Sequence, residues 1–330
     1  MKQRNLIILI LSLALVLAIL LGVTACLPSV TPGDTTPTTI PAESTNPSQP
    51  TDATQGTEAT VPITEPTVPP TEATTPSVPP TEPPPTEPDN EYIGKLYTRQ
   101  ELMAMENVNK GYGPGRGSNG SRPPYAESDQ KKYGKYGANF IAPDNGCIYL
   151  TFDCGYEYNN LTADILDTLK AKNVKAVFFV TMQYVKDHPE YVQRMIDEGH
   201  AVGNHTTHHP AMPTLSLDKM VSEVMTLHNY ILENFGYEMT LFRPPEGAFS
   251  TRTLAVVQSL GYKTVHWSFA YADWDPENQP DEVDALGLIT RSHHSGAIYL
   301  LHAVSQTNAN VLMDTIDYFR DQGYSLELFQ

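Results

Sequence analysis

The feature that most constrains this 330-residue chain is a regular alternation of apolar segments that begins at Cys147 and runs to the C-terminus. Short runs rich in β-branched and aromatic residues indicate buried strands, and apolar residues recur between them at helical spacing. Strands that alternate with helices favour parallel βα units, because a parallel pair needs a crossover connection. The expected strands are Ile148–Phe152, Lys175–Thr181, Ala201–Asn204, Leu241–Arg243, Lys263–Trp267, Ala297–Leu301 and Ser325–Leu328.

The number of these units predicts the fold class. About seven βα units without a glycine-rich dinucleotide signature favour a barrel over a doubly wound sheet. We therefore expect an α/β protein with a distorted, incomplete (β/α)7-type barrel. In such barrels the functional side chains gather at the C-terminal ends of the strands.

Polar side chains follow the predicted strands at that end. Any one of them has an ordinary explanation: Asp153 could cap a helix, and Arg243 could simply pair with Asp273. A series of such residues along one edge of a parallel sheet is instead typical of a site. The residues are Asp153, His205, His209, Arg243, Asp273, Trp274 and His302.

The segment His205-Thr206-Thr207-His208-His209 suggests a metal. One helical turn would place the rings of His205 and His209 on the same side, because they are four residues apart. Two imidazoles suit a divalent metal such as zinc, which in catalytic sites has a third protein ligand and an open position. The alternative is a solvated, histidine-rich loop.

Residues 1–26 resemble a lipoprotein signal peptide. Lys2 and Arg4 precede an apolar stretch that ends in Val23-Thr24-Ala25-Cys26, which is similar to a bacterial lipobox. Cleavage before Cys26 and lipidation of its thiol would follow, and the alternative is an uncleaved transmembrane anchor. Both interpretations predict an extracytoplasmic protein attached to the membrane at the cell surface.

Residues 27–90 contain 17 prolines, 17 threonines and no lysine or arginine, so we expect a disordered, extended Thr/Pro/Glu-rich linker. Residues 91–146 show no periodicity and are predicted to be an irregular N-terminal extension of the domain. Residues 147–330 are predicted to be the catalytic domain. An anchor followed by a long polar spacer suits a protein that reaches into a cell wall.

Charge and cysteine spacing exclude two interpretations. Of the net charge of −17, the linker carries −9 and Lys2 and Arg4 carry +2, which leaves −10 for residues 91–330. This acidic balance argues against nucleic acid as a partner. Cys147 and Cys154 flank one predicted strand, so they would lie roughly 20 Å apart and should not form a disulfide.

Five sequence blocks together resemble the polysaccharide deacetylases, the NodB-homology domain or carbohydrate esterase family four, from about Cys147 to Gln330. Further blocks, among them Gly155-Tyr156-Glu157 and Trp267-Ser268-Phe269-Ala270, are most similar to the subgroup that deacetylates muramic acid on the way to muramic δ-lactam in spore cortex. The five blocks are Thr151-Phe152-Asp153, His205-Thr206-x-x-His209, Arg243-Pro244-Pro245-x-Gly247, Asp273-Trp274 and Leu300-x-His302.

The resemblance implies roles for the polar residues. Asp153 would be the general base, positioned by Arg243, and His302 would be the general acid, oriented by Asp273. The backbone N–H of Glu246 would stabilise the oxyanion. Trp274 and Leu300 would form an apolar wall for the acetyl methyl group, and Pro245 and Tyr156 are expected on the substrate side of the site.

The resemblance also implies a divalent metal, with zinc as the expected ion, held by His205 and His209. Cys154 stands where most of the family has a metal-binding aspartate, and where the muramic subgroup usually has asparagine. It could be a thiolate ligand, an inert small residue or a lesion.

The predicted function is a metal-dependent N-deacetylase of peptidoglycan, acting on N-acetylmuramic acid and expected to be a monomer. The alternatives are a chitin- or xylan-type deacetylase and a non-catalytic lipoprotein that binds wall glycan. A transport-linked binding lipoprotein would need two α/β lobes, which exceeds the length available. The presence of both Asp153 and His302 favours an enzyme.

Overall fold

The structure, a computed structural model, describes residues 96–115, 117 and 120–330, all of which belong to the unit Pro80–Gln330. The predicted signal peptide, the lipobox at Cys26 and the linker 27–90 lie outside the described residues. Within the described part of the chain, every helix is too short or too polar to cross a bilayer.

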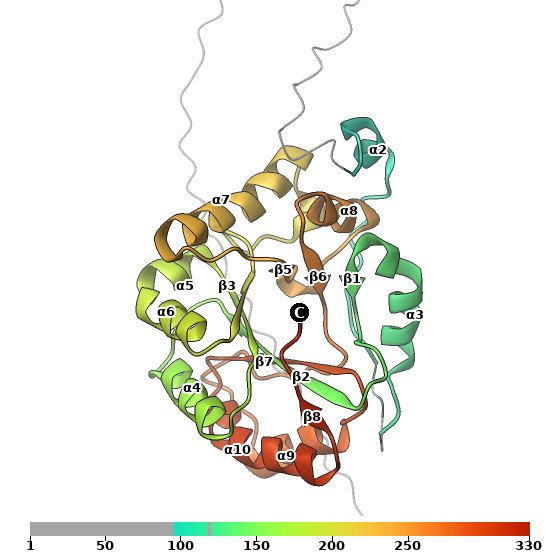
Figure 1. The fold of residues 1–330 in the computed structure, drawn as a ribbon. Coiled ribbons are helices and arrows are strands. Elements are labelled where there is room, and N and C mark those ends of the chain that lie inside the picture. Colours follow the sequence, from blue (N-terminus) through green and yellow to red (C-terminus); the bar gives the residue numbers. More distant parts are fainter. Residues whose placement is uncertain (1–95, 116, 118–119) are drawn as a thin grey trace, which may run out of the picture. The chain divides into compact units, whose positions relative to one another are not determined.

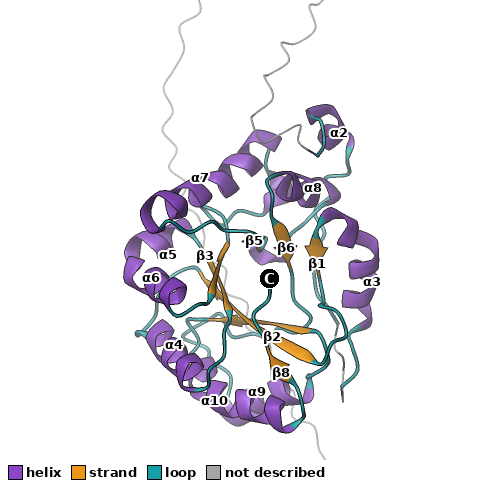
Figure 2. Ribbon diagram, viewed as in Figure 1, coloured by secondary structure: helices purple, strands orange, loops and turns teal. Residues whose placement is uncertain are grey.

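The strands form one parallel sheet in the order β1-β6-β5-β4-β3-β2-β7, with β8 beside β2. The sheet curls into a partial barrel, as predicted, and Figure 2 shows its strands inside a surround of helices. The strands are β1 (Ala138–Asn139), β2 (Cys147–Cys154), β3 (Val177–Val180), β4 (Ala201–Asn204), β5 (Leu241–Phe242), β6 (Lys263–Val265), β7 (Ala297–His302) and β8 (Ser325–Leu326).

The helices lie outside the strands in Figure 1. From β2 onward, at least one helix lies between each strand and the next along the chain, as expected for βα units. They are α2 (Arg99–Ala104), α3 (Pro124–Tyr133), α4 (Leu161–Ala171), α5 (Met182–Asp187), α6 (Pro189–Asp197), α7 (Leu217–Phe235), α8 (Thr251–Ser259), α9 (Glu282–Arg291) and α10 (Gln306–Asp321). The short 3₁₀ helices are η1 (Gly134–Tyr136), η2 (Met212–Thr214) and η3 (Pro245–Gly247).

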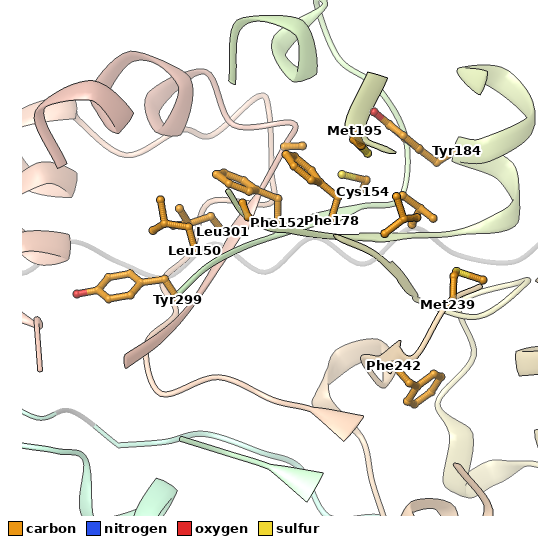
Figure 3. Close-up of a cluster of buried hydrophobic side chains, with 14 of the residues drawn as sticks. Leu150, Phe152, Cys154, Phe178, Tyr184, Met195, Met239, Phe242, Tyr299 and Leu301 are labelled. Atoms are coloured by element: carbon orange, nitrogen blue, oxygen red, sulfur yellow. The ribbon is translucent and has the colours of Figure 1, made fainter. Parts of the chain in front are cut away.

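The buried side chains form two clusters, one between the sheet and the helices and one inside the barrel. Strand β2 contributes to both, because its successive side chains point to opposite faces of the sheet. Its residues Ile148, Leu150, Phe152 and Cys154 belong to the main core between sheet and helices, shown in part in Figure 3. Tyr149 points the other way, into a smaller cluster inside the barrel with Val177, Phe179, Val265, Ile298 and Phe329. Asp153 therefore faces inward and Cys154 faces the helices.

The C-terminus closes the inside of the barrel. Strand β8 pairs with the first residues of β2, and the chain then carries Phe329 onto the ring of Tyr149, with 5.4 Å between the ring centroids. In Figure 1 the C-terminus accordingly lies within the ring of strands. This arrangement fills the end of the barrel where strands begin and leaves open the end where they finish.

The N-terminal extension is more regular than predicted. It contains α2, α3 and η1, and β1 pairs in parallel with β6 through Ala138 and Thr264. Phe140 and Tyr133 pack with Phe249 in a separate apolar cluster. A two-residue strand is too short to show periodicity, which is why the sequence predicted only irregular structure here.

Candidate active site

A cavity of about 1190 Å³ opens at the C-terminal ends of the strands. The sequence placed its candidate residues at this end, and the structure brings most of them to the cavity wall. Asp153, Tyr156, His205, His209, Glu246, Trp274, Leu300 and His302 all line it. Arg243 and Asp273 are buried behind the wall, with exposures of 0% and 1%.

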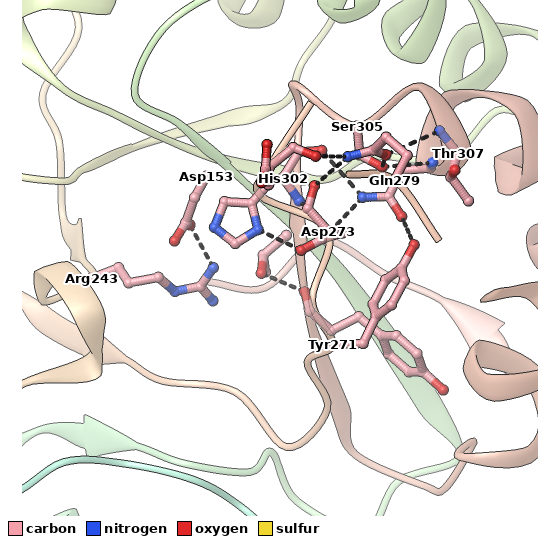
Figure 4. Close-up of polar contacts among 12 residues, drawn as sticks. Asp153, Arg243, Tyr271, Asp273, Gln279, His302, Ser305 and Thr307 are labelled. Carbon is pink, nitrogen blue, oxygen red and sulfur yellow. Dashed lines mark hydrogen bonds and ion pairs between the residues drawn. The ribbon is translucent and has the colours of Figure 1, made fainter. Parts of the chain in front are cut away.

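Arg243 holds Asp153 from behind. Its Nη1 donates to Asp153 Oδ1 at 2.8 Å, and its Nε and Nη2 donate to the carbonyl oxygens of Val265 and His266, both at 3.1 Å. The guanidinium lies over the ring of Phe179, 4.2 Å from its centroid. Figure 4 shows the ion pair at the edge of the site. Because three donors are fixed, the guanidinium sets the direction of the carboxylate.

Asp153 is thereby kept ionised. Burial alone would raise its pKa, but the charge of Arg243, aided by the neighbouring imidazoles of His205 and His302, outweighs burial and lowers the pKa below its ordinary value. A buried carboxylate that remains charged, with one oxygen facing a cavity, can accept a proton there.

His205 and His209 meet, but not by the predicted helical turn. The segment after β4 is a loop in which Thr206 and His209 have positive φ values of 71° and 58°. Asn204 and Thr206 hold this loop through side-chain bonds to the backbone N–H groups of Thr206 and His209. The two rings lie 4.8 Å apart between centroids. The prediction that the rings converge is confirmed, and the predicted turn is wrong.

The donor set fits a divalent cation. His205 Nδ1 must donate to the carbonyl oxygen of Arg243, 2.8 Å away, because a carbonyl can only accept. Burial lowers the His205 pKa to about 4, so the ring is neutral and Nε2 carries a lone pair. Nε2 lies 3.5 Å from Asp153 Oδ2, so the neutral ring places its lone pair beside a carboxylate, in surroundings that favour a cation.

A complete protein cage is not formed. Among the described residues, no group of three histidine, cysteine, aspartate or glutamate side chains has the geometry of a metal site on its own. His205 and His209 together would therefore hold a metal with coordination positions left for water and substrate, as catalytic sites require.

The structure does not bring Cys154 to the histidines. Its side chain is fully buried in the main core, beside Phe178, Tyr184 and Met195 in Figure 3. Burial raises the pKa of its thiol well above the ordinary value, and the charge of Asp153 adds to this. The expectation of a thiolate ligand therefore finds no support, since consecutive residues of a strand face opposite sides.

His302 and Asp273 form a second polar pair, beside Asp153. His302 Nδ1 lies 2.7 Å from Asp273 Oδ1, and the His302 backbone N–H donates to Oδ2 at 2.9 Å. Burial alone would lower the His302 pKa, but the hydrogen bond and charge of Asp273 and the charge of Asp153 raise it above the ordinary value. The Nε2 atom can thus carry a proton toward the cavity.

The pairing register explains why Asp153 and His302 lie side by side. Asp153 on β2 is the parallel partner of His302 on β7, the strand beside it. Their side chains therefore emerge on the same face at the same height. The two polar pairs, Asp153–Arg243 and His302–Asp273, are therefore neighbours in the wall of one cavity.

The turn at η3 presents a backbone edge to the cavity. Glu246 has φ 58° and Gly247 has φ 64°. A Cβ atom on Gly247 would lie 2.5 Å from the ring of Trp267, so this position requires glycine. Pro244 lines the cavity, whereas Pro245, which the sequence placed on the substrate side, is buried and does not line it.

Aromatic side chains frame the mouth. Trp274 and Tyr156 are 57% and 49% exposed, although both line the cavity. Trp274 stands edge-on to His302, with 6.2 Å between the rings. Leu300 lies deeper in the wall and is buried. Exposed aromatic faces of this kind suit the apolar faces of sugar rings.

Sequence reasoning missed two groups of residues. The first is the arm of the cavity along α5, which includes Gln183 and Lys186. The second is Asn308, which is buried and bonded to Asp273. A signal for Asn308 was present: it is a polar residue on the buried face of α10 that also carries Val311, Leu312, Thr315, Ile316 and Phe319.

Comparisons with known proteins agree with this site. The polysaccharide deacetylase family matches residues 141–265. An uncharacterized 30.6 kDa protein of Geobacillus stearothermophilus is 43% identical over 213 residues, which are 64% of this chain and 80% of the relative. The peptidoglycan-N-acetylmuramic acid deacetylase PdaA of Bacillus subtilis is 39% identical over 229 residues, which are 69% and 86%.

The fold is also similar to a solved structure. The structure of Bacillus subtilis PdaA, a family 4 carbohydrate esterase, superposes with a TM-score of 0.65 at 38% sequence identity. The matched region covers 68% of this chain and 96% of that one.

Proposed function

Because the chain belongs to the polysaccharide deacetylase family, we propose that it hydrolyses the N-acetyl group of muramic acid residues in peptidoglycan. One observation carries the proposal: an ionised Asp153 and a protonatable His302 lie side by side on neighbouring strands, in the wall of a cavity of about 1190 Å³. The choice of muramic acid is supported by the name of PdaA, which the chain matches over most of its length.

The cavity residues can divide the proton transfers. Asp153 accepts a proton from the attacking water, while the oxygen of that water forms a bond to the carbonyl carbon of the acetyl group. His302 donates a proton to the leaving nitrogen as the carbon–nitrogen bond breaks, which yields acetate and a free amine. The backbone N–H of Glu246, which lines the cavity, would stabilise the negative charge on the acetyl oxygen.

A divalent metal would be held by His205 and His209, and we propose zinc because both ligands are imidazoles. When bound, it would act as a Lewis acid on the acetyl group and lower the pKa of water. His205 contributes a neutral ring whose Nε2 is directed by the Arg243 carbonyl, and this orientation exists in the chain itself.

The positive charge of Lys186 in the cavity wall favours a negatively charged substrate. Among the described residues it is the one lysine or arginine that lines the cavity, and it forms no ion pair there. Its ammonium lies 5.6 Å from the centroid of Tyr230, on α7. Muramic acid carries a lactyl carboxyl group that glucosamine lacks, so a single uncompensated cation in the cavity favours muramic acid.

The test is product identity. The purified full-length protein, loaded with zinc, is incubated with peptidoglycan glycan strands that keep or lack their stem peptides. We expect acetate release, and mass spectrometry of the digested strands should find deacetylated muramic acid. Deacetylated glucosamine as the sole product would indicate a chitin-type deacetylase. Tight glycan binding without acetate release would indicate a non-catalytic wall-binding protein.

We further propose that the protein is a monomeric lipoprotein at the cell surface, on the basis of the lipobox at Val23–Cys26. A role in spore cortex synthesis would follow if muramic acid is the substrate. Cys26→Ala should abolish partitioning into detergent, because lipidation needs the thiol. If the variant stays in the detergent phase with an intact N-terminus, the anchor is an uncleaved helix.

A further inference from the structure

Asn308 is placed behind the proposed acid without touching the cavity. It lies in the first turn of α10, is 2% exposed, and does not line the cavity. Its Nδ2 donates to Asp273 Oδ2 at 2.6 Å and to the His302 carbonyl oxygen at 3.2 Å. One amide group therefore contacts both members of the His302–Asp273 pair.

The orientation of this amide is fixed by chemistry. The His302 carbonyl can only accept a hydrogen bond, so the NH₂ group must face it. The amide oxygen then faces Tyr271, whose hydroxyl donates to it. The backbone N–H of Asn308 is in turn bonded to Ser305 Oγ at 3.0 Å, which ties the residue to the helix cap.

The contacts of Asp273 show what this arrangement does. Its side chain receives three hydrogen bonds: from His302 Nδ1, from the His302 backbone N–H, and from Asn308 Nδ2. The His302 backbone N–H holds Oδ2 from strand β7, and Asn308 Nδ2 holds the same oxygen from α10, which leaves Oδ1 directed at His302 Nδ1. Asn308 thus supplies a second anchor from outside the sheet, and Figure 4 shows the surrounding network of Tyr271, Gln279, Ser305 and Thr307.

We propose that Asn308 is a positioning residue for the deacetylation reaction, which holds the Asp273 carboxylate against His302 Nδ1 so that Nε2 is presented to the leaving nitrogen. The inference rests on the proposed function. It assigns Asn308 no contact with substrate: its effect passes through Asp273. Removing its amide should therefore reduce the rate of the proton-transfer step and not the affinity for glycan.

The test variant is Asn308→Leu, which keeps the branched shape and the number of side-chain heavy atoms and removes the hydrogen bonds. The matched control is Asn310→Leu, two residues on in the same helix, where the asparagine is exposed and bonded to Glu282. Both variants are also made in the Asp273→Asn background. Measurements are kcat and KM for acetate release, the thermal unfolding midpoint, and the downfield proton resonance of the His302 Nδ1–H···Asp273 hydrogen bond.

We expect Asn308→Leu to lower kcat by about 10–100-fold, part of the usual effect of a general acid, with KM nearly unchanged. The downfield resonance should move or broaden in Asn308→Leu and remain unchanged in Asn310→Leu. In the Asp273→Asn background, Asn308→Leu should cause no further loss, because the two residues act as one unit.

Two results would overturn the proposal: an equal loss in both backgrounds, or an Asn308→Leu variant indistinguishable from Asn310→Leu. If Asn308→Leu does not fold, Asn308→Ala replaces it, because the smaller side chain removes the same hydrogen bonds without adding volume. Unchanged kcat and an unchanged resonance in Asn308→Ala would equally overturn it. If the wild type releases no acetate, the proposed function fails, while the resonance still tests the positioning.

Discussion

At the scale of single residues, Asp153 and His302 should carry the chemistry. Asp153→Asn and His302→Ala are each expected to reduce acetate release by about 10²–10⁴-fold, the usual contribution of a general base or acid. Initial rates on a defined muramic acid oligosaccharide measure this. Near-wild-type rates in either variant would remove that residue from the mechanism.

The two substitutions should differ in stability. Asp153 is the counter-charge of the fully buried Arg243, so Asp153→Asn leaves a guanidinium uncompensated. We expect it to lower the free energy of unfolding by about 3–5 kcal/mol. His302 is partly exposed at the cavity, and His302→Ala should change stability much less. Denaturant titration of both variants distinguishes these outcomes, and equal losses would contradict the role of the Asp153–Arg243 ion pair.

The raised pKa of His302 predicts a pH dependence. The acid form of a group with a raised pKa persists to higher pH, so activity should decline only as pH rises through that value. Asp273→Asn removes the hydrogen-bonded charge that raises the pKa. The alkaline limb of kcat/KM should then move to lower pH. A limb that stays in place would show that His302 does not set it.

At the scale of elements, the turn η3 depends on one glycine. Gly247→Ala would bring a Cβ atom 2.5 Å from the ring of Trp267, at a φ of 64°. Gly261 is the matched control, because its φ is 88° and nothing lies within 4 Å of the added Cβ. We expect Gly261→Ala to cost about 1 kcal/mol, the usual cost of a positive φ. Gly247→Ala should cost more and also lower activity, since Glu246 would shift. Equal losses of stability in the two variants would mean that the Trp267 ring moves aside at no cost in free energy.

The elements also show what could be predicted from the chain. Strand Ala201–Asn204 was predicted to the residue, and β2 and β7 nearly so, because long apolar runs report burial on both faces. The short helix α5 and the two-residue β1 were missed, since neither is long enough for a period to emerge. The same limit hid Lys186, which lies on α5.

Position in the chain also decided which residues of the site could be predicted from the sequence. Residues directly after strands could be predicted, because parallel strands end at one edge. The convergence of His205 and His209 was correct for the wrong reason, since left-handed residues and not a helical turn direct the rings. Asn308 could not be paired with Asp273, because the contact joins residues 35 apart in the chain through the packing of α10.

At the scale of the whole molecule, charge favours one kind of substrate contact. The net charge of the protein is −17, whereas Lys186 places a positive charge in the cavity wall. Lys186→Gln should lower kcat/KM about fivefold on strands with a free lactyl carboxylate, and the effect should shrink at high salt. It should have no effect on strands whose carboxyl groups are amidated.

The control for net charge is Lys263→Gln, at the first residue of β6 and thus at the end of the sheet opposite the cavity. It alters the total charge equally and should leave both substrates unaffected. If stem-peptide carboxylates, and not the lactyl group, are the contact, Lys186→Gln will matter only on peptide-bearing strands. Equal effects of the two variants would show a long-range field and no local contact.

The opposite orientations of Asp153 and Cys154 have a consequence for how such a chain can change over generations. Deleting one residue earlier in β2 would turn the Asp153 carboxylate into the main core and the Cys154 thiol into the cavity. All the side chains after the deletion would change faces in the same way. Insertions and deletions within β2 or β7 would therefore disrupt the site, and so would a longer loop after β7, which positions Ser305 and Asn308. Substitutions at the cavity wall can therefore change which substrate binds, while the register of β2 and β7 keeps Asp153 and His302 in place.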